Sequence, residues 1–411
     1  MTRNRFRSEC SSCSQVFQHY VSFCPSCRAM TDVRYDLDQV VRGDSANPYQ
    51  RFLDLLPVAD PELLPADAQY TPTIHAQSLG AQLGLPWLYL KDETGLPTAT
   101  TKDRMAAVAL PYLYELGVRE FATSSTGNSS SAYAQAIARV PEMTMYVFTA
   151  EAFRNRLTLA GSPQVVDVVV RDATFVEAFE AAGEYATDHG ITSERGFFNP
   201  GRREGLKLAW LEAVEQVPRR IDWYVQAVSS AMGVFGVFKA AGEMVELGWA
   251  EATPRLLCVQ QESCAPMVTA WRDGSATIRS RDVVPNPRGI GTAILRGDPT
   301  RTYPHVHRIV RASNGTFTAV SEAAIRDARD MVEELEGVSV CFSAAAAVAG
   351  LAELARTGYF SPADTFLVNL TGGERPATPT TEQTQWVSRV DRRWNFEDIR
   401  RPNSPSGNFG R

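Results

Sequence analysis

Short apolar runs alternate with longer amphipathic stretches from about residue 87 to the end of the chain. Several of the runs are almost continuously hydrophobic, which is typical of strands covered on both faces. The predicted strands are 87–91, 120–123, 144–148, 165–170, 223–228, 256–260 and 365–369. The stretches between them include predicted helices at 131–139, 175–189, 235–247, 322–335 and 344–356. Regular alternation of strand and helix predicts an α/β fold with parallel sheets and right-handed crossovers.

Composition restricts the function classes. The chain has 411 residues, 44% hydrophobic and 21% charged, with a net charge of -6 and a pI near 5.6. An acidic chain does not suit a general nucleic-acid binder, whose surface is basic. No apolar run approaches the length of a membrane span, and the Arg-bearing start lacks an apolar signal core. We therefore expect a cytoplasmic protein of two or three domains with no nucleic-acid or membrane partner.

Four of the seven cysteines form two closely spaced pairs near the N-terminus, Cys10 with Cys13 and Cys24 with Cys27. Two such pairs predict a tetrahedral site for one structural zinc ion. A ribbon of this size can bind nucleic acid, but a metal-stapled accessory packed on the main body is the more frequent use. His19 lies between the pairs and is predicted to be a bystander, because four thiolates already complete the coordination.

One lysine stands out among small and hydroxylated residues. Lys102 follows the predicted strand 87–91 and a turn with Gly95 and Pro97, and it opens a helix-forming run. Loss of water around such a lysine favours its neutral, nucleophilic form, as a Schiff-base lysine requires. The alternative is a solvated surface lysine at a helix start.

Two further strand-to-helix junctions are suited to anions. Residues 222–239 form a strand, a turn of small residues and a helix start, so that backbone N–H groups and the helix dipole face an anion. Residues 123–131 repeat this arrangement with seven hydroxyl side chains around Gly127 and Asn128. A capped helix is the alternative in both places. Neither Gly-x-Gly-x-x-Gly nor Gly-Lys-Ser/Thr occurs where a nucleotide fold needs it.

Four segments resemble, in the same order, those of fold-type II pyridoxal-phosphate enzymes, and most of all the threonine synthase and cysteate synthase branch. They are Lys102-Asp-Arg104, Ser125-Thr-Gly-Asn128, Ser229-Ser-Ala-Met-Gly233 and Leu370-Thr-Gly-Gly373. The resemblance runs from about Cys10 to Pro376. It implies an enzyme with two parallel-sheet, three-layer domains and an N-terminal zinc-ribbon-like module, and it implies a homodimer.

The resemblance also implies roles for individual residues. Lys102 carries the cofactor and acts as general base, and Thr371 faces the pyridine nitrogen. The cofactor phosphate is held by Ser229, Ser230, Ala231, Met232 and Gly233. The substrate carboxylate is held by Ser125, Thr126 and Gly127, with Asn128 at the cofactor's phenolic oxygen. Asn199 and Arg202 match the residues that meet the substrate's distal phosphate.

Two departures from the family pattern affect substrate choice. Ala99-Thr100-Thr101 replaces the usual Gly-Ser-Phe before the lysine, and Cys341-Phe342-Ser343 replaces Glu-Pro-Ala. Losing a carboxylate near the cofactor suits a β-elimination better than the longer threonine synthase reaction. We therefore expect β-replacement on an O-phosphorylated amino acid, O-phosphoserine, through aminoacrylate, with a lyase or transferase activity in amino-acid biosynthesis.

Two alternatives remain open from the sequence. One is threonine synthase acting on O-phosphohomoserine. The other is a zinc-ribbon binding or regulatory protein with a decayed catalytic body. The predicted boundaries are 1–35 for the zinc module, 36–105 and 196–375 for the large cofactor-binding domain, 106–195 for a smaller mobile domain, and 376–411 for a C-terminal arm.

Overall fold

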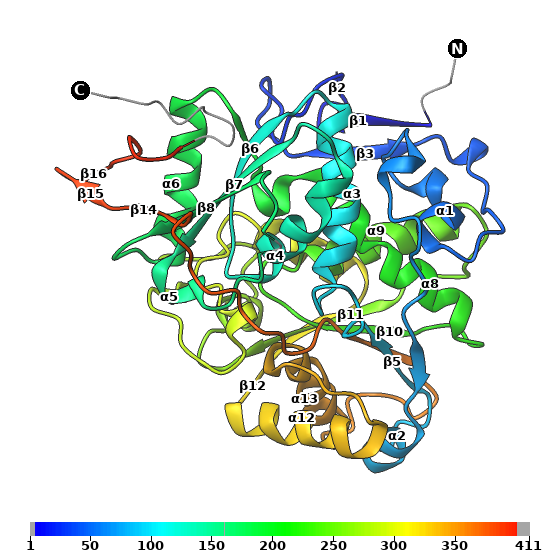
Figure 1. Ribbon diagram of the computed structural model, residues 1–411. Helices are drawn as coiled ribbons and strands as arrows, with labels where there is room; N and C mark the ends of the chain where they lie inside the picture. Colours follow the sequence, from blue (N-terminus) through cyan, green and yellow to red (C-terminus); the bar gives the residue numbers. More distant parts are fainter. Residues whose placement is uncertain (1–4, 160, 401–411) are drawn as a thin grey trace, which may run out of the picture.

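Two parallel β-sheets, each covered by helices on both faces, form the body of the computed structural model, which describes residues 5–159 and 161–400 (Figure 1). The larger sheet has the strand order β12-β11-β10-β13-β5-β4, and only β4 is antiparallel to its neighbour. Its strands are β4 Thr73–His75, β5 Leu88–Asp92, β10 Trp223–Ala227, β11 Arg255–Gln261, β12 Thr316–Val320 and β13 Phe366–Leu370.

The smaller sheet has the order β14-β8-β7-β6-β9 and is parallel throughout. Its strands are β6 Glu120–Ser124, β7 Thr144–Ala150, β8 Val165–Val170, β9 Thr192–Ser193 and β14 Gln385–Val387. The helices are α1 Pro48–Arg51, α2 Gln77–Leu83, α3 Lys102–Glu115, α4 Asn128–Ala136, α5 Glu151–Arg154, α6 Phe175–Asp188, α7 Pro200–Leu206, α8 Leu208–Gln216, α9 Met232–Glu246, α10 Pro266–Arg272, α11 Tyr303–Ala312, α12 Glu322–Glu336 and α13 Phe342–Arg356.

Alternate residues of the strands enter different cores, which makes each sheet the middle of three layers. In β5, Leu88 and Leu90 pack with α13, whereas Tyr89 faces the core formed with α3, α7 and α9. In β7, Tyr146 and Phe148 pack against α6, on the opposite face from Met145 and Val147. The expected α/β fold with two parallel-sheet, three-layer units is confirmed.

Helix α3 joins the two sheets by packing against both α4 and α7. The approach to α7 requires glycine, because a Cβ at Gly205 would lie 2.3 Å from the carbonyl oxygen of Arg104. A Cβ at Gly201 would lie 2.9 Å from the Cα of Ala109. This close contact fixes the helix that starts with Lys102.

The predicted strands agree with the observed ones to within two residues, but the strands β4, β9, β12 and β14 of the two large sheets were not predicted. Strand β12 was not predicted, because Thr316–Val320 alternates polar and apolar residues at the edge of the sheet rather than forming a continuous apolar run. Helices α4, α9 and α13 begin two to three residues earlier than predicted, in small or polar residues that carry little periodic signal.

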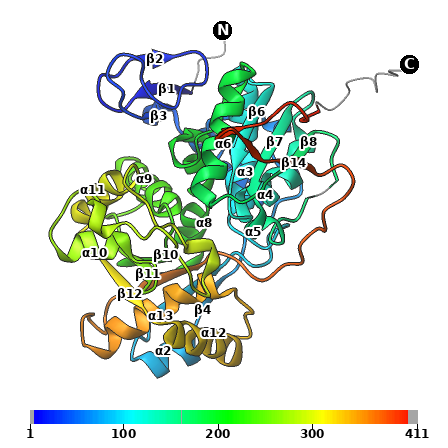
Figure 2. The ribbon, with the colours of Figure 1, turned by 90° about the vertical axis from the view of Figure 1, so that its left-hand side faces the viewer.

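The N-terminal module is a three-stranded antiparallel sheet of β1 Phe6–Cys10, β2 Val16–Phe17 and β3 Thr31–Tyr35. It stands at one end of the molecule, at the upper left of Figure 2, and β3 packs against α7. Buried polar contacts join it to the body. Asp32 accepts hydrogen bonds from Arg203 and Lys239 at 3.2 Å each, and the Tyr35 hydroxyl donates to Glu204 at 2.6 Å. The module is thus packed on the main body of the protein, as expected for an accessory.

The C-terminal segment crosses back from the larger sheet to the smaller one, where β14 pairs in parallel with β8 (Figure 1). On the way, Arg154 donates a hydrogen bond to the carbonyl oxygen of Thr378 at 2.7 Å. A two-stranded hairpin follows, β15 Arg389–Val390 and β16 Arg393–Trp394. The predicted module 1–35 and arm 376–411 include residues 1–4 and 401–411, which lie outside the described residues. No helix in the described ranges is long and apolar enough to span a membrane.

Candidate active site

A cavity of about 150 Å³ lies between the two sheets, at the carboxyl ends of their strands. Ligands of open α/β sheets bind at this edge. All four sequence segments reach it from the end of a strand. Ser125 to Asn128 follow β6, Ser229 to Gly233 follow β10, Thr371 follows β13, and Lys102 follows β5 after the loop 93–101. The predicted residues that line it are Lys102, Ser125, Thr126, Asn128, Arg202, Ser229, Ser230, Ala231, Met232, Gly233 and Thr371.

Lys102 differs from every other lysine of the chain. The chain contains only four lysines. Lys91 and Lys207 are buried and Lys239 is half-buried, and each forms an ion pair with glutamate. The Lys102 ammonium makes no hydrogen bond or ion pair with any described residue. Burial, followed by the nearby Arg202 guanidinium, lowers the pKa of Lys102 from 10.5 to about 8. A neutral amine is therefore accessible near physiological pH, as nucleophilic attack requires.

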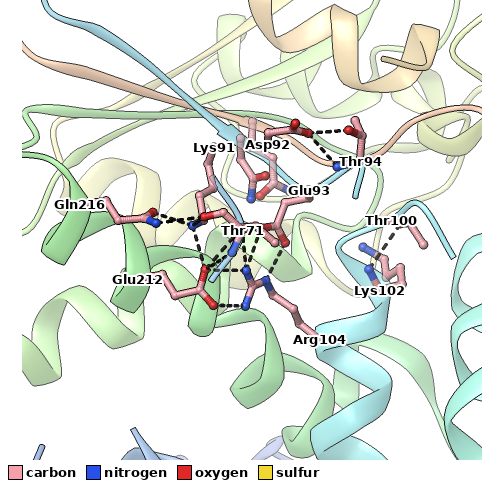
Figure 3. Close-up of polar contacts among 12 residues, drawn as sticks. Thr71, Lys91, Asp92, Glu93, Thr94, Thr100, Lys102, Arg104, Glu212 and Gln216 are labelled. Atoms are coloured by element: carbon pink, nitrogen blue, oxygen red, sulfur yellow. Dashed lines mark hydrogen bonds and ion pairs between the residues drawn. The ribbon is translucent and has the colours of Figure 1, made fainter. Parts of the chain in front are cut away.

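A charge-balanced network holds the first turn of the lysine helix (Figure 3). Arg104 donates to Glu93 at 2.7 Å and to Glu212 at 2.6 Å, and all three are buried. Lys91 donates to Glu212 at 2.8 Å, and Thr71 bridges Glu93 and Arg104. Because Arg104 lies two residues after Lys102, this network fixes the helix start that carries the lysine, while Lys102 itself stays outside it.

The three residues before Lys102, Ala99 to Thr101, keep a glycine-like backbone although none of them is glycine. Ala99 has φ +50°, in the left-handed region, and its carbonyl oxygen accepts a hydrogen bond from the Gly373 N–H at 3.0 Å. The Thr101 N–H donates to the carbonyl oxygen of Thr371 at 2.9 Å. A Cβ at Gly372 would lie 2.4 Å from the Ala99 carbonyl oxygen. The lysine loop and the Thr371 loop are thus held together as one wall.

The predicted phosphate loop has the geometry of an anion site. Ala231, with φ +58°, precedes α9, a helix of 15 residues whose first N–H groups face the cavity edge. A Cβ at Gly233 would lie 2.8 Å from the Gln226 amide oxygen, so the loop needs glycine there. Met232 is buried in the main core as well as lining the wall. Ala231 thus has a left-handed backbone conformation that glycine adopts more easily.

The loop after β6 is ordered by its own hydroxyl groups. Ser125 Oγ accepts hydrogen bonds from the Gly127 and Ser130 N–H groups at 3.2 and 3.1 Å. Gly127 has φ +130° and does not itself line the cavity. Asn128 Oδ1 accepts a hydrogen bond from Arg375 at 2.8 Å. The sequence interpretation missed Arg375. It lies in the loop after β13 of the larger sheet and therefore orients Asn128, which follows β6 of the smaller sheet.

The two residues predicted for the distal phosphate have other partners. Asn199 is fully buried away from the cavity wall; its amide donates to Glu194 at 2.7 Å, and its Oδ1 caps α7 at the Gly201 N–H. This arrangement does not support its predicted contact with substrate. Arg202 lines the cavity, but both its Nε and a terminal nitrogen donate to Glu194. Its charge is thus already neutralised.

The cavity fits a polar, phosphorylated group. Two of its wall hydroxyls, Thr101 Oγ1 and Ser124 Oγ, are buried without a hydrogen-bond partner. Unpaired polar groups in a buried wall are costly unless a ligand satisfies them. Together with an unpaired lysine and a helix N-terminus, they match the aldehyde, phosphate and polar ring substituents of pyridoxal phosphate.

Burial raises the pKa of Cys341, so this wall residue is a neutral thiol.

Fold and site together are those of a pyridoxal-phosphate enzyme. The chain belongs to the family of pyridoxal-phosphate dependent enzymes, which matches residues 66–372. It is 27% identical over 379 residues to cysteate synthase of Methanospirillum hungatei, covering 89% of each chain. It is also 27% identical over 378 residues to threonine synthase of Methanosarcina acetivorans, covering 89% of this chain and 91% of the relative.

Solved structures show the same fold. Maize serine racemase superimposes with a TM-score of 0.61 at 21% identity, over 74% of this chain and 88% of that one. Diaminopropionate ammonia lyase from Escherichia coli gives a TM-score of 0.61 at 16% identity, over 75% and 86%. The expected family and enzyme class are confirmed, and the alternative of a regulatory protein with a decayed body is not favoured.

Proposed function

We propose that the protein replaces the phosphate of O-phosphoserine with an incoming nucleophile, giving a β-substituted alanine and inorganic phosphate. The observation that carries this proposal is Lys102, the one lysine without a partner among the described residues, at the junction of loops suited to a phosphate and a carboxylate. The names of the relatives support a synthase acting on a phosphorylated amino acid. Within this branch, Cys341 in place of a carboxylate favours the shorter β-replacement.

Each group has a stated task in this reaction. The first N–H groups of α9 and the hydroxyls of Ser229 and Ser230 hold the cofactor phosphate, and Thr371 meets the ring nitrogen without adding a charge. Bound pyridoxal phosphate withdraws electrons from the α-carbon of the amino acid. Ser125 and Thr126 hold the substrate carboxylate, Gly127 gives the turn that presents them, and Asn128 meets the cofactor's phenolic oxygen.

Lys102 Nζ moves the proton. Neutral Nζ removes the α-proton, and the Cβ–O bond breaks with its electron pair leaving on phosphate. The nucleophile then forms a bond to Cβ and gives up its proton, and Lys102 returns a proton to the α-carbon. The net change is O-phosphoserine plus H–X giving X–alanine plus phosphate.

Offering O-phosphoserine and O-phosphohomoserine separately tests the proposal. We expect phosphate release from O-phosphoserine, with substituted alanines identified by mass spectrometry when nucleophiles are added. The competing function, supported by the threonine synthase relatives, is addition of water to the β-carbon after loss of phosphate from O-phosphohomoserine. Threonine formed from O-phosphohomoserine, with O-phosphoserine inert, would decide for that function.

We also propose that the four N-terminal cysteines hold one structural zinc ion. Their Sγ atoms all lie within 4.8 Å of one another, and Cys10 and Cys27 are 3.3 Å apart. This clustering of four sulfur ligands suits a closed tetrahedral site. His19 is exposed and is not part of the cluster. A homodimer remains a prediction from the resemblance.

A further inference from the structure

A second, larger chamber adjoins the active-site cavity. It has a volume of about 960 Å³ and lies between α6 and the loop 283–301. The two spaces share four wall residues, Phe175, Phe179, Leu295 and Arg296. Arg296 is the only charged residue among them. A molecule in the chamber therefore reaches the reacting carbon by passing this arginine.

The chamber is large for a small inorganic nucleophile. A water molecule occupies about 30 Å³, whereas sites for drug-sized ligands measure roughly 300–1,000 Å³. Its walls include apolar side chains from both sides, Phe153 and Val176 on one and Val283, Pro285 and Pro287 on the other. These surfaces suit an apolar body, which water or a small oxyanion lacks.

Arg296 carries a charge that no ion pair balances; the exposed Asp298 carboxylate is near it but makes no contact with it. Arg296 forms no ion pair with any residue in the described ranges, and its Nε is buried without a hydrogen-bond partner. By contrast, Arg202, the other arginine lining the inner cavity, is fully paired with Glu194. The carboxylates that line the chamber, Glu180, Glu184, Asp188 and Asp298, are all exposed. The inner end of the chamber is therefore positive.

The loop that presents Arg296 is held in place from three sides. The Gln261 amide donates to the Gly291 carbonyl oxygen at 3.1 Å, and the Ala293 N–H donates to Ser343 Oγ at 3.0 Å. The Val284 N–H donates to the Gly297 carbonyl oxygen at 3.0 Å. A half-buried guanidinium on an anchored loop is a preorganised anion site.

We propose that the chamber binds the second substrate, an organic nucleophile with an apolar body and a carboxylate or similar anionic group that Arg296 recognises. This inference rests on the proposed β-replacement and names the class of its acceptor. With a thiol acceptor, the S–H and Cβ–O bonds break and a C–S bond forms at Cβ. Phosphate leaves with the electrons of the C–O bond and takes up the thiol proton, and the α-carbon regains the proton that Lys102 removed.

Binding of an unreactive probe to the holoenzyme tests the site without chemistry. The probes are 4-(methylthio)benzoate and its neutral amide of nearly the same shape, titrated by calorimetry. A charge-assisted contact with Arg296 should favour the benzoate by about tenfold. Arg296→Gln should reduce this preference to within about twofold. Arg356→Gln, which changes an arginine whose side chain is 72% exposed at the end of α13, should retain it.

Equal binding of the two probes, or a preference that survives Arg296→Gln, would overturn the proposal, as would binding of sulfite alone. The reaction is then followed with O-phosphoserine and 4-mercaptobenzoate, and we expect S-(4-carboxyphenyl)cysteine by mass spectrometry. Absence of this product while sulfite is incorporated would also overturn it. Phosphate release without acceptor tests the proposed function separately: no release, with the benzoate preference intact, refutes O-phosphoserine and leaves the anion site standing.

Discussion

Two alanines stand in left-handed backbone at the candidate active site. Ala99, three residues before Lys102, has φ +50°. Ala231, immediately before helix α9, has φ +58°. An L-residue with a Cβ pays roughly 1–2 kcal/mol for this conformation, and glycine does not. The glycine-rich backbone of the family is thus preserved without its glycines. The sequence shows the substitutions but not the retained backbone conformation. At Ala99, a hydrogen bond from the distant Gly373 N–H helps to impose that conformation.

Ala231→Gly should therefore stabilise the fold. We expect a gain of about 0.5–1 kcal/mol in the free energy of unfolding, because relief of the left-handed strain exceeds the extra entropy of unfolded glycine. Denaturant unfolding measures it, with Ala240→Gly in the middle of α9 as the matched control, which should lose stability. A loss at both positions would contradict the strain assigned to Ala231.

The lowered pKa of Lys102 predicts how the apoprotein takes up its cofactor. Since the folded protein lowers the pKa from 10.5 to about 8, the neutral amine is already present at lower pH than in an exposed lysine. The rate at which pyridoxal phosphate becomes linked to the apoprotein should rise with pH and level off above a midpoint near 8. Stopped-flow absorbance gives the rate. A midpoint near 10 would mean that the lysine is solvated.

At the scale of elements, sequence periodicity located most of the large-sheet strands but not what anchors them. The apolar runs at β10 and β13 are visible because both faces are buried. The partners of Arg104 are not visible in the sequence, because Glu93 and Glu212 become neighbours of Arg104 only in the folded chain. Arg296 lies in a loop with no periodic signal, and only the cavity geometry separates it from a solvated arginine.

The N-terminal module is predicted to depend on metal. Cys24→Ser should release zinc, since three thiolates no longer close the tetrahedron, and backbone amides of β1 to β3 should exchange faster with solvent. Much of the cofactor absorption band should remain, because the cavity contains no residue of this module. Elemental analysis and hydrogen exchange measure these effects. Freshly purified, reduced wild-type protein without zinc would refute the assignment.

Strand β14 closes one edge of the smaller sheet. The sequence did not predict it, because the strand has only three residues and lies within a polar stretch of the C-terminal segment. A chain ending at residue 380 should expose the edge of β8, and amide exchange at Val165–Val170 should accelerate. A chain ending at residue 388 keeps β14 and serves as the control. The strands of the larger sheet should exchange as before in both. Unchanged protection of β8 in the shorter chain would mean that β14 contributes nothing to this sheet.

At the scale of the molecule, two helix-covered sheets meet where every chemically important loop emerges from a strand end. Residue types at these four junctions were predictable, since hydroxyl and glycine residues after apolar runs are visible in the sequence. The distribution of charge between the sheets was not. Arg202 is neutralised by Glu194, whereas Arg296 is not, and the sequence alone does not distinguish them.

The most direct test of this account is reduction of the holoenzyme with borohydride, followed by peptide mapping of the attached pyridoxyl group. With only four lysines in the chain and three of them paired with glutamate, the map has few outcomes. The account predicts one pyridoxyl group on Lys102 and none in Lys102→Ala. A label on Lys91, Lys207 or Lys239 would contradict it.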